Sequence, residues 1–498
     1  MKYMHFNSSC SYAGLANLLA MQGVDTEDSQ IALDMGLPYF LRYDEQSGAY
    51  LNGPMLQSAE WFDLYLRPRG FRYVECFMQR QEAVKQLRQG SMLGLQVTSK
   101  SKHAVIFLGK ENEIYKFLNN KREDSEEPDY LWLSEEECLE RLPEQAVIGH
   151  LEPCFAEEIE RTPYFEEALQ NWERLRFDLH KFISIMQNPQ EMKEAMNRLF
   201  RPLLLDGLSM AKLLKENELE DCLTQLQKQF LAMVRKNGAV TPKNELDGGE
   251  IDWVIDKFLN LVRLQSIRES ERNSHIELYS SEELYKEGSW LNKPIKTVTD
   301  LFPLFDGCKD FCALDLGSGV GRNSIAIAKQ FRDISCRVDC VDILEIAIEK
   351  LLENAKRFGV EEYIHGEVCP IEDYKIVPDS YDLILAVSAL EHIDSKESFV
   401  KKLVEMKAGT KPQGIVCLVV NSEIREKNKE TGEELFPQFE VNLPTKELQE
   451  ILQNVFADWE VLKSTVRGQQ YDIPREDCVS ELSTNVVSYV VRKKENRT

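Results

Sequence analysis

The spacing of hydrophobic residues along the chain changes twice, and these changes divide the sequence into three blocks. Residues 1–152 mix short apolar runs with helical spacing, which indicates an α+β domain. Residues 153–272 carry apolar positions at helical spacing, for example around Trp172 and Leu226, and predict a helical linker domain. Residues 273–498 alternate apolar runs with amphipathic stretches, which predicts an α/β domain built on a mostly parallel sheet.

The last block predicts a Rossmann-like sheet of seven strands. Its first strand is the apolar run "CALDL", and its second ends at Asp342 before an amphipathic helix that Gly359 terminates. The stretch "YIHGEVCPIEDY" predicts a third strand and an acidic loop, and the runs "YDLILAV" and "GIVCLVV" predict a fourth and a fifth strand. Residues 459–469 and 485–494 predict terminal antiparallel strands. In such sheets a ligand lies across the carboxyl ends of the parallel strands.

Composition narrows the function classes. The chain has 498 residues, 43% of them hydrophobic, and a formal net charge of −24. Such an acidic chain is a poor partner for nucleic acid or an anionic membrane, so a cytoplasmic enzyme without either partner is expected. No apolar run reaches the roughly 18 residues that span a bilayer. The twelve cysteines include close pairs, but none has the second pair or histidines of a zinc site, so no metal is expected.

A glycine-rich turn follows the first strand of the last block, in "LDLGSGVGRNS". Its glycines are Gly317, Gly319 and Gly321. A dinucleotide-binding loop requires its third glycine at the position that Arg322 occupies, and the G-K-[ST] of a P-loop is also missing. Asp315, at the strand end, would repel phosphate and attract a cation. The loop therefore suits a ligand whose nearest group is not a phosphate.

These motifs resemble those of class I S-adenosylmethionine-dependent methyltransferases. The resemblance rests on "LDLGSGVGRNS", on the strand that ends at Asp342 and on "SALEHI", and it covers about residues 275–492. Within that class, "DILEIAIEKL" and the stretch from "GEELFPQFEVNLPTKELQEIL" to "WEVLKS" are similar to the tellurite-resistance type. The resemblance implies S-adenosylmethionine as cofactor and a small molecule or biosynthetic intermediate as methyl acceptor.

The resemblance also implies roles for individual residues. Asp315 would pair with the cofactor's amino group, Asp342 would hold the ribose, and Ile343 would pack on the adenine. Either Glu372 or Asp373 would accept from the adenine amino group. The full set of implied cofactor-binding residues is Asp315, Gly317, Ser318, Gly319, Gly321, Asp342, Ile343, Glu372, Asp373, Val387 and Ser388.

The methyl-donor side is expected at the end of the fourth strand. The resemblance places Val387 and Ser388 there, and Glu367 stays open as another partner of the adenine. Because a sulfonium methyl group is already a strong electrophile, alignment of the nucleophile supplies much of the rate. His392, next to Glu391, is either a general base or substrate contact, or a residue that only begins a helix.

The N-terminal block has residues in the order of a papain-like triad. Cys10 follows the capping candidates Ser8 and Ser9 and opens an apolar helix, where free N–H groups stabilise a thiolate and lower its pKa. His103 begins a later strand, and Asn119 ends the next one. In such a triad the cysteine attacks an acyl group, the histidine transfers the proton and the asparagine orients the ring.

The block resembles the papain-like superfamily, in particular the butirosin-biosynthesis-type acyltransferases and the bacteriocin-processing cysteine peptidases. The resemblance rests on "SSCSYAGLANLLAMQGVD", "LRQGSMLGLQV" and "HAVIFLGKENEIYKF". Those peptidases place a glutamine six residues before the cysteine, where this chain has Met4, with Asn7 as the nearest amide; they also favour aspartate over Asn119. These departures favour acyl transfer or a lapsed site over proteolysis. An inert Cys10 and an unrelated His103 are the alternative.

Together the blocks predict a methyltransferase fused to a cysteine acyltransferase-like or peptidase-like domain, in natural-product biosynthesis. An acyl- or peptidyl-carrier protein is the macromolecular partner that this hypothesis allows. A second hypothesis makes the N-terminal region a non-catalytic module that presents a substrate or carrier protein. A third makes the chain a metalloid-detoxifying methyltransferase of the tellurite type.

Overall fold

The computed structural model forms two compact units, residues 1–265 and residues 266–498. The structure describes residues 1–99, 101–156, 164–186, 189–235, 246, 248–281, 283–289, 291–435, 437, 439–475 and 478–495. The three-domain division drawn from the sequence stays a prediction. One long helix, α11 (Gly248–Ser281), runs through its proposed boundary at residue 272.

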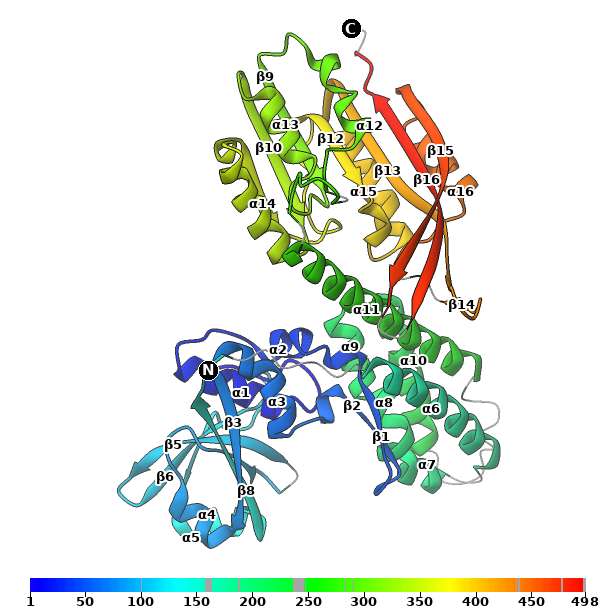
Figure 1. The fold of residues 1–498 in the computed structure, drawn as a ribbon. Coiled ribbons are helices and arrows are strands. Elements are labelled where there is room, and N and C mark those ends of the chain that lie inside the picture. Colours follow the sequence, from blue (N-terminus) through cyan, green and yellow to red (C-terminus); the bar gives the residue numbers. More distant parts are fainter. Residues whose placement is uncertain are drawn as a thin grey trace. The chain divides into compact units, whose positions relative to one another are not determined.

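The first unit contains an antiparallel sheet with a helix packed on it (Figure 1). Its strands are β3 Phe71–Gln79, β4 Met92–Gln96, β5 Lys102–Glu111, β6 Ile114–Asn119, β7 Tyr130–Leu133 and β8 Gln145–Pro153. Its helices are α1 Cys10–Met21, α2 Asp28–Asp34, α3 Ala59–Leu66, α4 Arg80–Gln86 and α5 Glu135–Arg141. The strand order is β3-β8-β4-β5-β6-β7, and α1 packs against β5. The unit is therefore α+β here, as predicted, while its papain-like identity stays a prediction.

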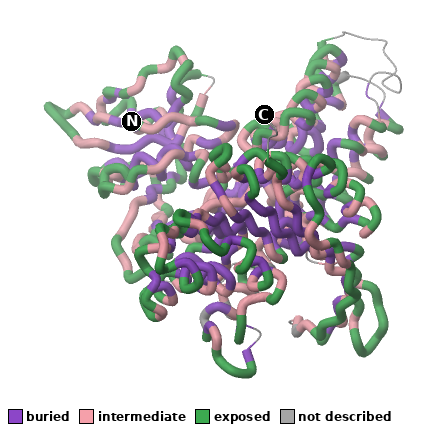
Figure 2. Tube along the Cα trace, turned by 90° about the horizontal axis from the view of Figure 1, so that it is seen from above, coloured by how far each residue is buried: buried purple, intermediate pink, exposed green. Residues whose placement is uncertain are grey.

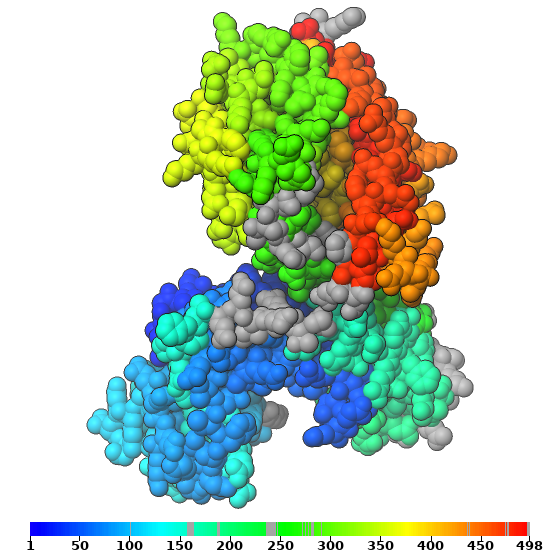
Figure 3. Space-filling model, in the orientation of Figure 1, coloured from blue at the N-terminus to red at the C-terminus, as the bar shows by residue number. Residues whose placement is uncertain are grey.

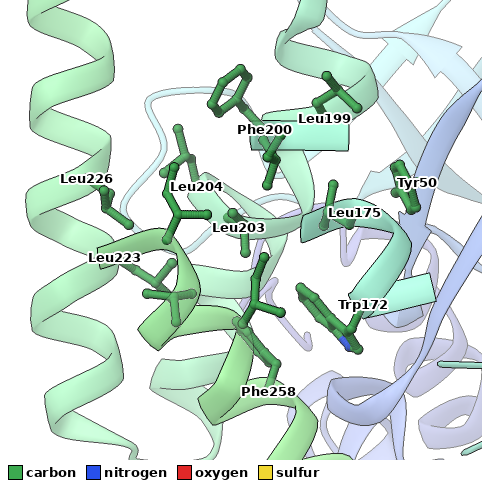
Figure 4. Packing of buried hydrophobic residues seen from close by; sticks show 14 of the residues in the cluster. Tyr50, Trp172, Leu175, Leu199, Phe200, Leu203, Leu204, Leu223, Leu226 and Phe258 are labelled. Atoms are coloured by element: carbon green, nitrogen blue, oxygen red, sulfur yellow. The ribbon is translucent and has the colours of Figure 1, made fainter. Parts of the chain in front are cut away.

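A helical bundle completes the first unit. Its helices are α6 Phe165–Ile185, α7 Pro189–Ala195, α8 Arg201–Leu204, α9 Asp206–Leu213, α10 Asn217–Arg235 and the first half of α11. Trp172 is fully buried and stacks on Phe258 with ring centroids 4.4 Å apart (Figure 4). Leu41 and Tyr50, from the hairpin β1 (Leu41–Asp44) and β2 (Ala49–Asn52), join the same core. This shared core explains why the bundle and the N-terminal residues form one unit.

The second unit is built on the predicted sheet. Its strands are β9 Asp310–Leu316, β10 Ser335–Asp342, β11 Ile364–Val368, β12 Tyr381–Val387, β13 Thr410–Asn428, β14 Glu434–Leu435, β15 Glu460–Pro474 and β16 Val479–Arg492. The order is β11-β10-β9-β12-β13-β16-β15, with β14 paired to β13. The first five strands of this order are parallel, and β16, β15 and β14 are antiparallel. The mostly parallel Rossmann-like core with antiparallel terminal strands is thus confirmed, and β14 is an addition.

Helices cover both faces of this sheet. Besides the second half of α11, the described residues of this unit form the helices α12 Lys296–Thr299, α13 Ser324–Phe331, α14 Glu345–Arg357, α15 Lys396–Gly409 and α16 Thr445–Val455. Side chains alternate along each strand, so Ala313 of β9 joins the core under α13 and α14, while Leu314 joins the core under α15 and α16. The strands form a buried layer between these helices (Figure 2). Each large apolar side chain buried there contributes about 1.5–3 kcal/mol.

One edge of the sheet is longer than the rest. Val419 of β13 lies opposite Val387, the last residue of β12, yet β13 continues to Asn428. Because the two strands are parallel, residues 420–428 project beyond the carboxyl edge where ligands bind. β15 and β16 pair along this extension and form one side of the unit, in orange and red in Figure 3. The extension therefore borders the ligand-binding edge.

Candidate functional site

The glycine turn after β9 adopts backbone conformations that favour glycine. Gly317, Gly319 and Gly321 have φ angles of +73°, +52° and +91°. A Cβ atom on Gly317 would lie 2.3 Å from the Cβ of Ala389, and one on Gly321 would lie 2.5 Å from Leu351. The turn therefore needs these glycines both for its left-handed backbone and for its close packing.

Asp315 lies at the end of β9 and is almost fully buried. Its carboxylate accepts a hydrogen bond from the Ser324 hydroxyl, at the start of α13. The pKa of Asp315 is raised to about 7, mainly by burial; the Ser324 hydrogen bond opposes this shift, and the nearby Asp342 carboxylate adds to it. A cationic partner would stabilise the ionised form of this buried carboxylate.

Asp342 ends β10 and faces the same turn. Its two oxygens accept hydrogen bonds from the backbone N–H groups of Gly319 (2.9 Å) and Leu344 (3.0 Å). Burial raises the pKa of Asp342, whereas these hydrogen bonds and the charges of His275 and His392 lower it. The carboxylate is thus held rigidly at the strand end, where the sequence predicted a ribose-binding acid.

Other predicted cofactor residues lie around these two acids. Ile343 exposes 55% of its surface, so an apolar face is presented directly beside Asp342. The Ser318 hydroxyl is buried and has no hydrogen-bond partner among the described residues. Glu372 is partly buried and pairs with Arg268 at 3.3 Å, while Asp373 is exposed. Burial raises the pKa of Glu372, and the Arg268 guanidinium opposes this.

The end of β12 forms the other side of the predicted site. Val387 is partly buried, and Ser388 has a φ angle of +50° and donates its N–H to the Val419 carbonyl at 2.8 Å. A short 3-10 helix, Leu390–His392, follows. The Nδ1 atom of His392 lies 3.2 Å from a carboxylate oxygen of Glu440.

Four functional candidates escaped the sequence analysis: Arg268, His275, Tyr279 and Glu440. The first three lie on the second half of α11, before the glycine motif. A Cβ atom on Gly319 would lie 2.9 Å from the Tyr279 hydroxyl, so Tyr279 covers the turn. Arg268 also pairs with Glu440 at 3.4 Å. The helical spacing of apolar residues was the one sequence signal for α11. No motif links Arg268, His275 or Tyr279 to the loops that they contact.

The residues present fit S-adenosylmethionine. Asp315 is a buried acid suited to the ammonium group, Asp342 is a fixed acid suited to ribose hydroxyls, and the exposed Ile343 suits the adenine face. The Ser318 hydroxyl adds a buried hydrogen-bonding group that has no partner among the residues described by the structure. These observations agree with the roles that the resemblance implied, which remain proposals residue by residue.

The N-terminal unit places the predicted triad residues on neighbouring elements. Cys10 begins α1 and lies against a hydrophobic core, and His103 lies on β5, on which α1 packs. The two nitrogens of His103 contact the Asn120 carbonyl (Nδ1, 3.2 Å) and the Glu127 carboxylate (Nε2, 3.2 Å). The Asn119 amide donates instead to the Pro128 carbonyl at 3.0 Å.

His103 is therefore oriented by Glu127, which the sequence analysis missed, and not by the side chain of Asn119. Within the part of the chain that the structure describes, His103 makes no hydrogen bond to Cys10. Glu127 lies in the acidic loop "KREDSEEPD" between β6 and β7, and its position among several similar acids gave no local signal.

Comparison with known proteins identifies similarity to methyltransferases in the second unit. Residues 309–463 match the family model described as a methyltransferase domain. Two curated proteins of Rauvolfia serpentina, ajmaline N-methyltransferase and norajmaline N-methyltransferase, are 28% identical over 95 and 99 residues, which is 19% and 20% of this chain. The chain spans about a third of the length of these relatives, 32% and 33%.

Solved structures resemble part of the chain. TehB from Haemophilus influenzae has 21% identity and a TM-score of 0.30, and the match covers 40% of this chain and 61% of that one. The 1,6-didemethyltoxoflavin-N1-methyltransferase of Burkholderia thailandensis, solved with S-adenosylhomocysteine, has 18% identity and a TM-score of 0.31, covering 47% and 89%. Among the residues that the structure describes, no helix is long and apolar enough to cross a membrane. With the family match and the Rossmann-like sheet together, the second unit contains a class I S-adenosylmethionine-dependent methyltransferase domain.

Proposed function

We propose that the chain methylates a nitrogen atom of a small molecule or biosynthetic intermediate, with S-adenosylmethionine as the methyl donor. The observation that carries this proposal is the pair of buried acids, Asp315 and Asp342, at adjacent strand ends beside the glycine turn. Glu372, Glu391 and Glu440 add further carboxylates at the same edge of the sheet. Such an environment favours cationic and amine ligands.

The residues of this chain bind and orient rather than supply the reactive group. When bound, S-adenosylmethionine supplies a sulfonium methyl group that is electrophilic towards a nitrogen lone pair. Asp315 would hold the ammonium end of the cofactor, Asp342 would hold the ribose, and Glu372 would accept from the adenine amino group. Val387 and Ser388 border the place where the acceptor approaches, and Tyr279 covers the glycine turn and limits the entry of water.

A labelled-methyl assay tests the acceptor class. The full chain is incubated with methyl-tritiated S-adenosylmethionine and separate panels of secondary amines, phenols, thiols and tellurite. We expect label in the amine panel. Label in tellurite alone would support the detoxification hypothesis, and label in phenols or thiols alone would overturn the nitrogen assignment. The plant N-methyltransferases that this chain resembles support the amine panel as the first choice.

As a second function, we propose that Cys10 and His103 handle an acyl or peptidyl group delivered by a small molecule or a carrier protein. The supporting observation is that the helix of Cys10 packs on the strand of His103, whose ring Glu127 orients. Domain fusion of this kind suits natural-product biosynthesis, with both steps in the cytoplasm.

Alkylation of Cys10 tests this second function. Mass spectrometry follows iodoacetamide labelling against pH, with the other eleven cysteines as internal controls. We expect Cys10 to react faster than the rest near neutral pH and to lose that lead in His103→Ala. If Cys10 reacts no faster than the rest, the N-terminal region is a non-catalytic module that presents a substrate or carrier.

A further inference from the structure

The segment of residues 439–443 is fixed against the edge of the methyltransferase sheet. The Val441 N–H donates to the Glu391 carbonyl, and the Leu443 carbonyl accepts from the Glu423 N–H, both at 2.9 Å. The Asn442 side chain pairs with both backbone groups of Ile424, at 2.9 and 2.8 Å. Val441 and Leu443 are buried in the sheet core. These contacts make residues 439–443 a rigid support.

This support presents two consecutive residues to His392. The Phe439 ring stacks on the imidazole with a centroid distance of 5.0 Å and an interplanar angle of 29°. Glu440 places one carboxylate oxygen 3.2 Å from Nδ1 of the same ring. One residue therefore fixes the plane of the imidazole, and the next fixes its rotation in that plane.

The Glu440 carboxylate is itself held in place. Its side chain is only 4% exposed, and its second oxygen lies 3.4 Å from Nε of Arg268. Arg268 also contacts Glu372, on the cofactor side of the site, at 3.3 Å. A buried carboxylate needs a partner, and the Arg268 guanidinium is such a partner for Glu440 beside the imidazole.

The ring that Glu440 holds lies close to the predicted cofactor site. His392 is among the groups whose charge lowers the pKa of Asp342, the acid proposed to bind the ribose. His392 also follows β12, whose end borders the expected path of the methyl acceptor. A neutral imidazole that donates Nδ1–H to a carboxylate has its lone pair on Nε2.

We propose that Glu440 is a positioning residue that acts through His392. Glu440 keeps the imidazole proton on Nδ1, so Nε2 accepts the proton that the acceptor nitrogen loses. The nitrogen lone pair forms the new bond to the methyl carbon, the carbon–sulfur bond breaks with its electron pair remaining on sulfur, and the N–H proton passes to Nε2. The imidazolium then returns this proton to solvent. This inference rests on the proposed function of nitrogen methylation.

Nitrogen NMR of the histidine rings tests the positioning role directly. The full chain is labelled with ring-15N histidine and measured near pH 9, where imidazoles are neutral. Seven histidines give few enough signals for His392 to be assigned from the His392→Gln variant. We expect the Nδ1–H tautomer of His392 in the wild type, a mixed tautomer in Glu440→Ala, and the wild-type tautomer in Glu440→Gln, whose carbonyl oxygen still accepts a hydrogen bond.

Glu447→Ala is the matched control, because Glu447 pairs with Lys396 near the same support but does not touch His392. We expect it to leave the tautomer unchanged. With an acceptor from the amine panel, Glu440→Ala should lower kcat about 100-fold, as loss of a general base does, and leave KM for the cofactor within about twofold. An Nε2–H tautomer in the wild type would overturn the inference, even if Glu440→Ala does not fold.

Calorimetry with S-adenosylhomocysteine separates this inference from the proposed function. If the wild type binds and His392 has the Nε2–H tautomer, the positioning role is wrong and the methyltransferase assignment stands. If the wild type does not bind, the proposed function fails. An unchanged tautomer in a folded Glu440→Ala variant would also contradict the role of Glu440.

Discussion

The ionisation of Asp315 should couple cofactor binding to pH. Burial raises the pKa of this carboxyl from its ordinary 3.8 to about 7, so the free chain holds it mostly protonated at pH 6. The ammonium group of the cofactor pairs with the ionised form. Binding should therefore release a proton at pH 6, and affinity should rise as pH increases through 7.

The size of this effect follows from the pKa. A group with a pKa of about 7 is roughly one tenth ionised at pH 6 and roughly nine tenths ionised at pH 8. If only the ionised form binds, the affinity for S-adenosylhomocysteine increases about tenfold over this range, or about 1.4 kcal/mol. About 0.9 proton is released per ligand at pH 6.

Isothermal titration calorimetry measures both quantities. Titrations at pH 6, 7 and 8 give the affinity, and titrations at pH 6 in phosphate and in imidazole buffer give proton release from the difference in apparent enthalpy. Asp315→Asn is the matched variant, because its amide keeps an acceptor for Ser324 but cannot ionise. We expect it to bind more weakly and with no such pH dependence. A wild-type affinity that is equal at pH 6 and pH 8, with no proton release, would refute this reasoning.

Three further changes test the fold and the site. Gly317→Ala should lower the free energy of unfolding by about 3 kcal/mol, because it adds a steric clash to left-handed strain. Gly359→Ala, which has open space at its Cβ, should lower it by about 1 kcal/mol. Urea unfolding of both variants measures the difference, and equal losses of stability would contradict the prediction. Trp172→Ala should lower the free energy of unfolding by about 3–5 kcal/mol, whereas Phe177→Ala, at an exposed position on the same helix, should lower it by less than about 0.5 kcal/mol. If thermal unfolding shows Phe177→Ala to be as destabilising as Trp172→Ala, the proposed core is wrong. Glu391→Gln should raise the melting temperature at pH 8 more than at pH 5, because burial raises the pKa of Glu391 and its ionisation at higher pH destabilises the fold. If scanning calorimetry finds the same change in melting temperature at both pH values, this reasoning is wrong.

Local patterns predicted the methyltransferase sheet well. The apolar run before Asp315, the glycine turn and the acid at residue 342 are all encoded within about 30 residues, because a strand, a tight turn and a helix are specified by their own residues. The antiparallel terminal strands followed from their alternating pattern. The added strand β14 has only two residues and left no such pattern.

Long-range partners could not be predicted in the same way. Glu440 pairs with Arg268, which lies 172 positions earlier in the chain, and nothing in either local sequence signals the other. The same holds for His103 and Glu127, because one of several acids in a loop is selected only when the strands fold. Helical spacing predicted part of α11, but did not indicate that it would continue to residue 281 and place Tyr279 over the glycine turn.

The central claim is that the ends of β9 and β10 bind S-adenosylmethionine. Calorimetric titration of the full chain with S-adenosylhomocysteine at pH 8 tests it most directly, with Asp342→Asn and, as a control, Asp310→Asn, which changes an exposed acid at the other end of β9. We predict one binding site per chain, about a tenfold or greater loss of affinity in Asp342→Asn, as expected for a hydrogen bond to a charged group, and no change in Asp310→Asn. Absence of binding, or equal affinity in wild type and Asp342→Asn, would contradict the account.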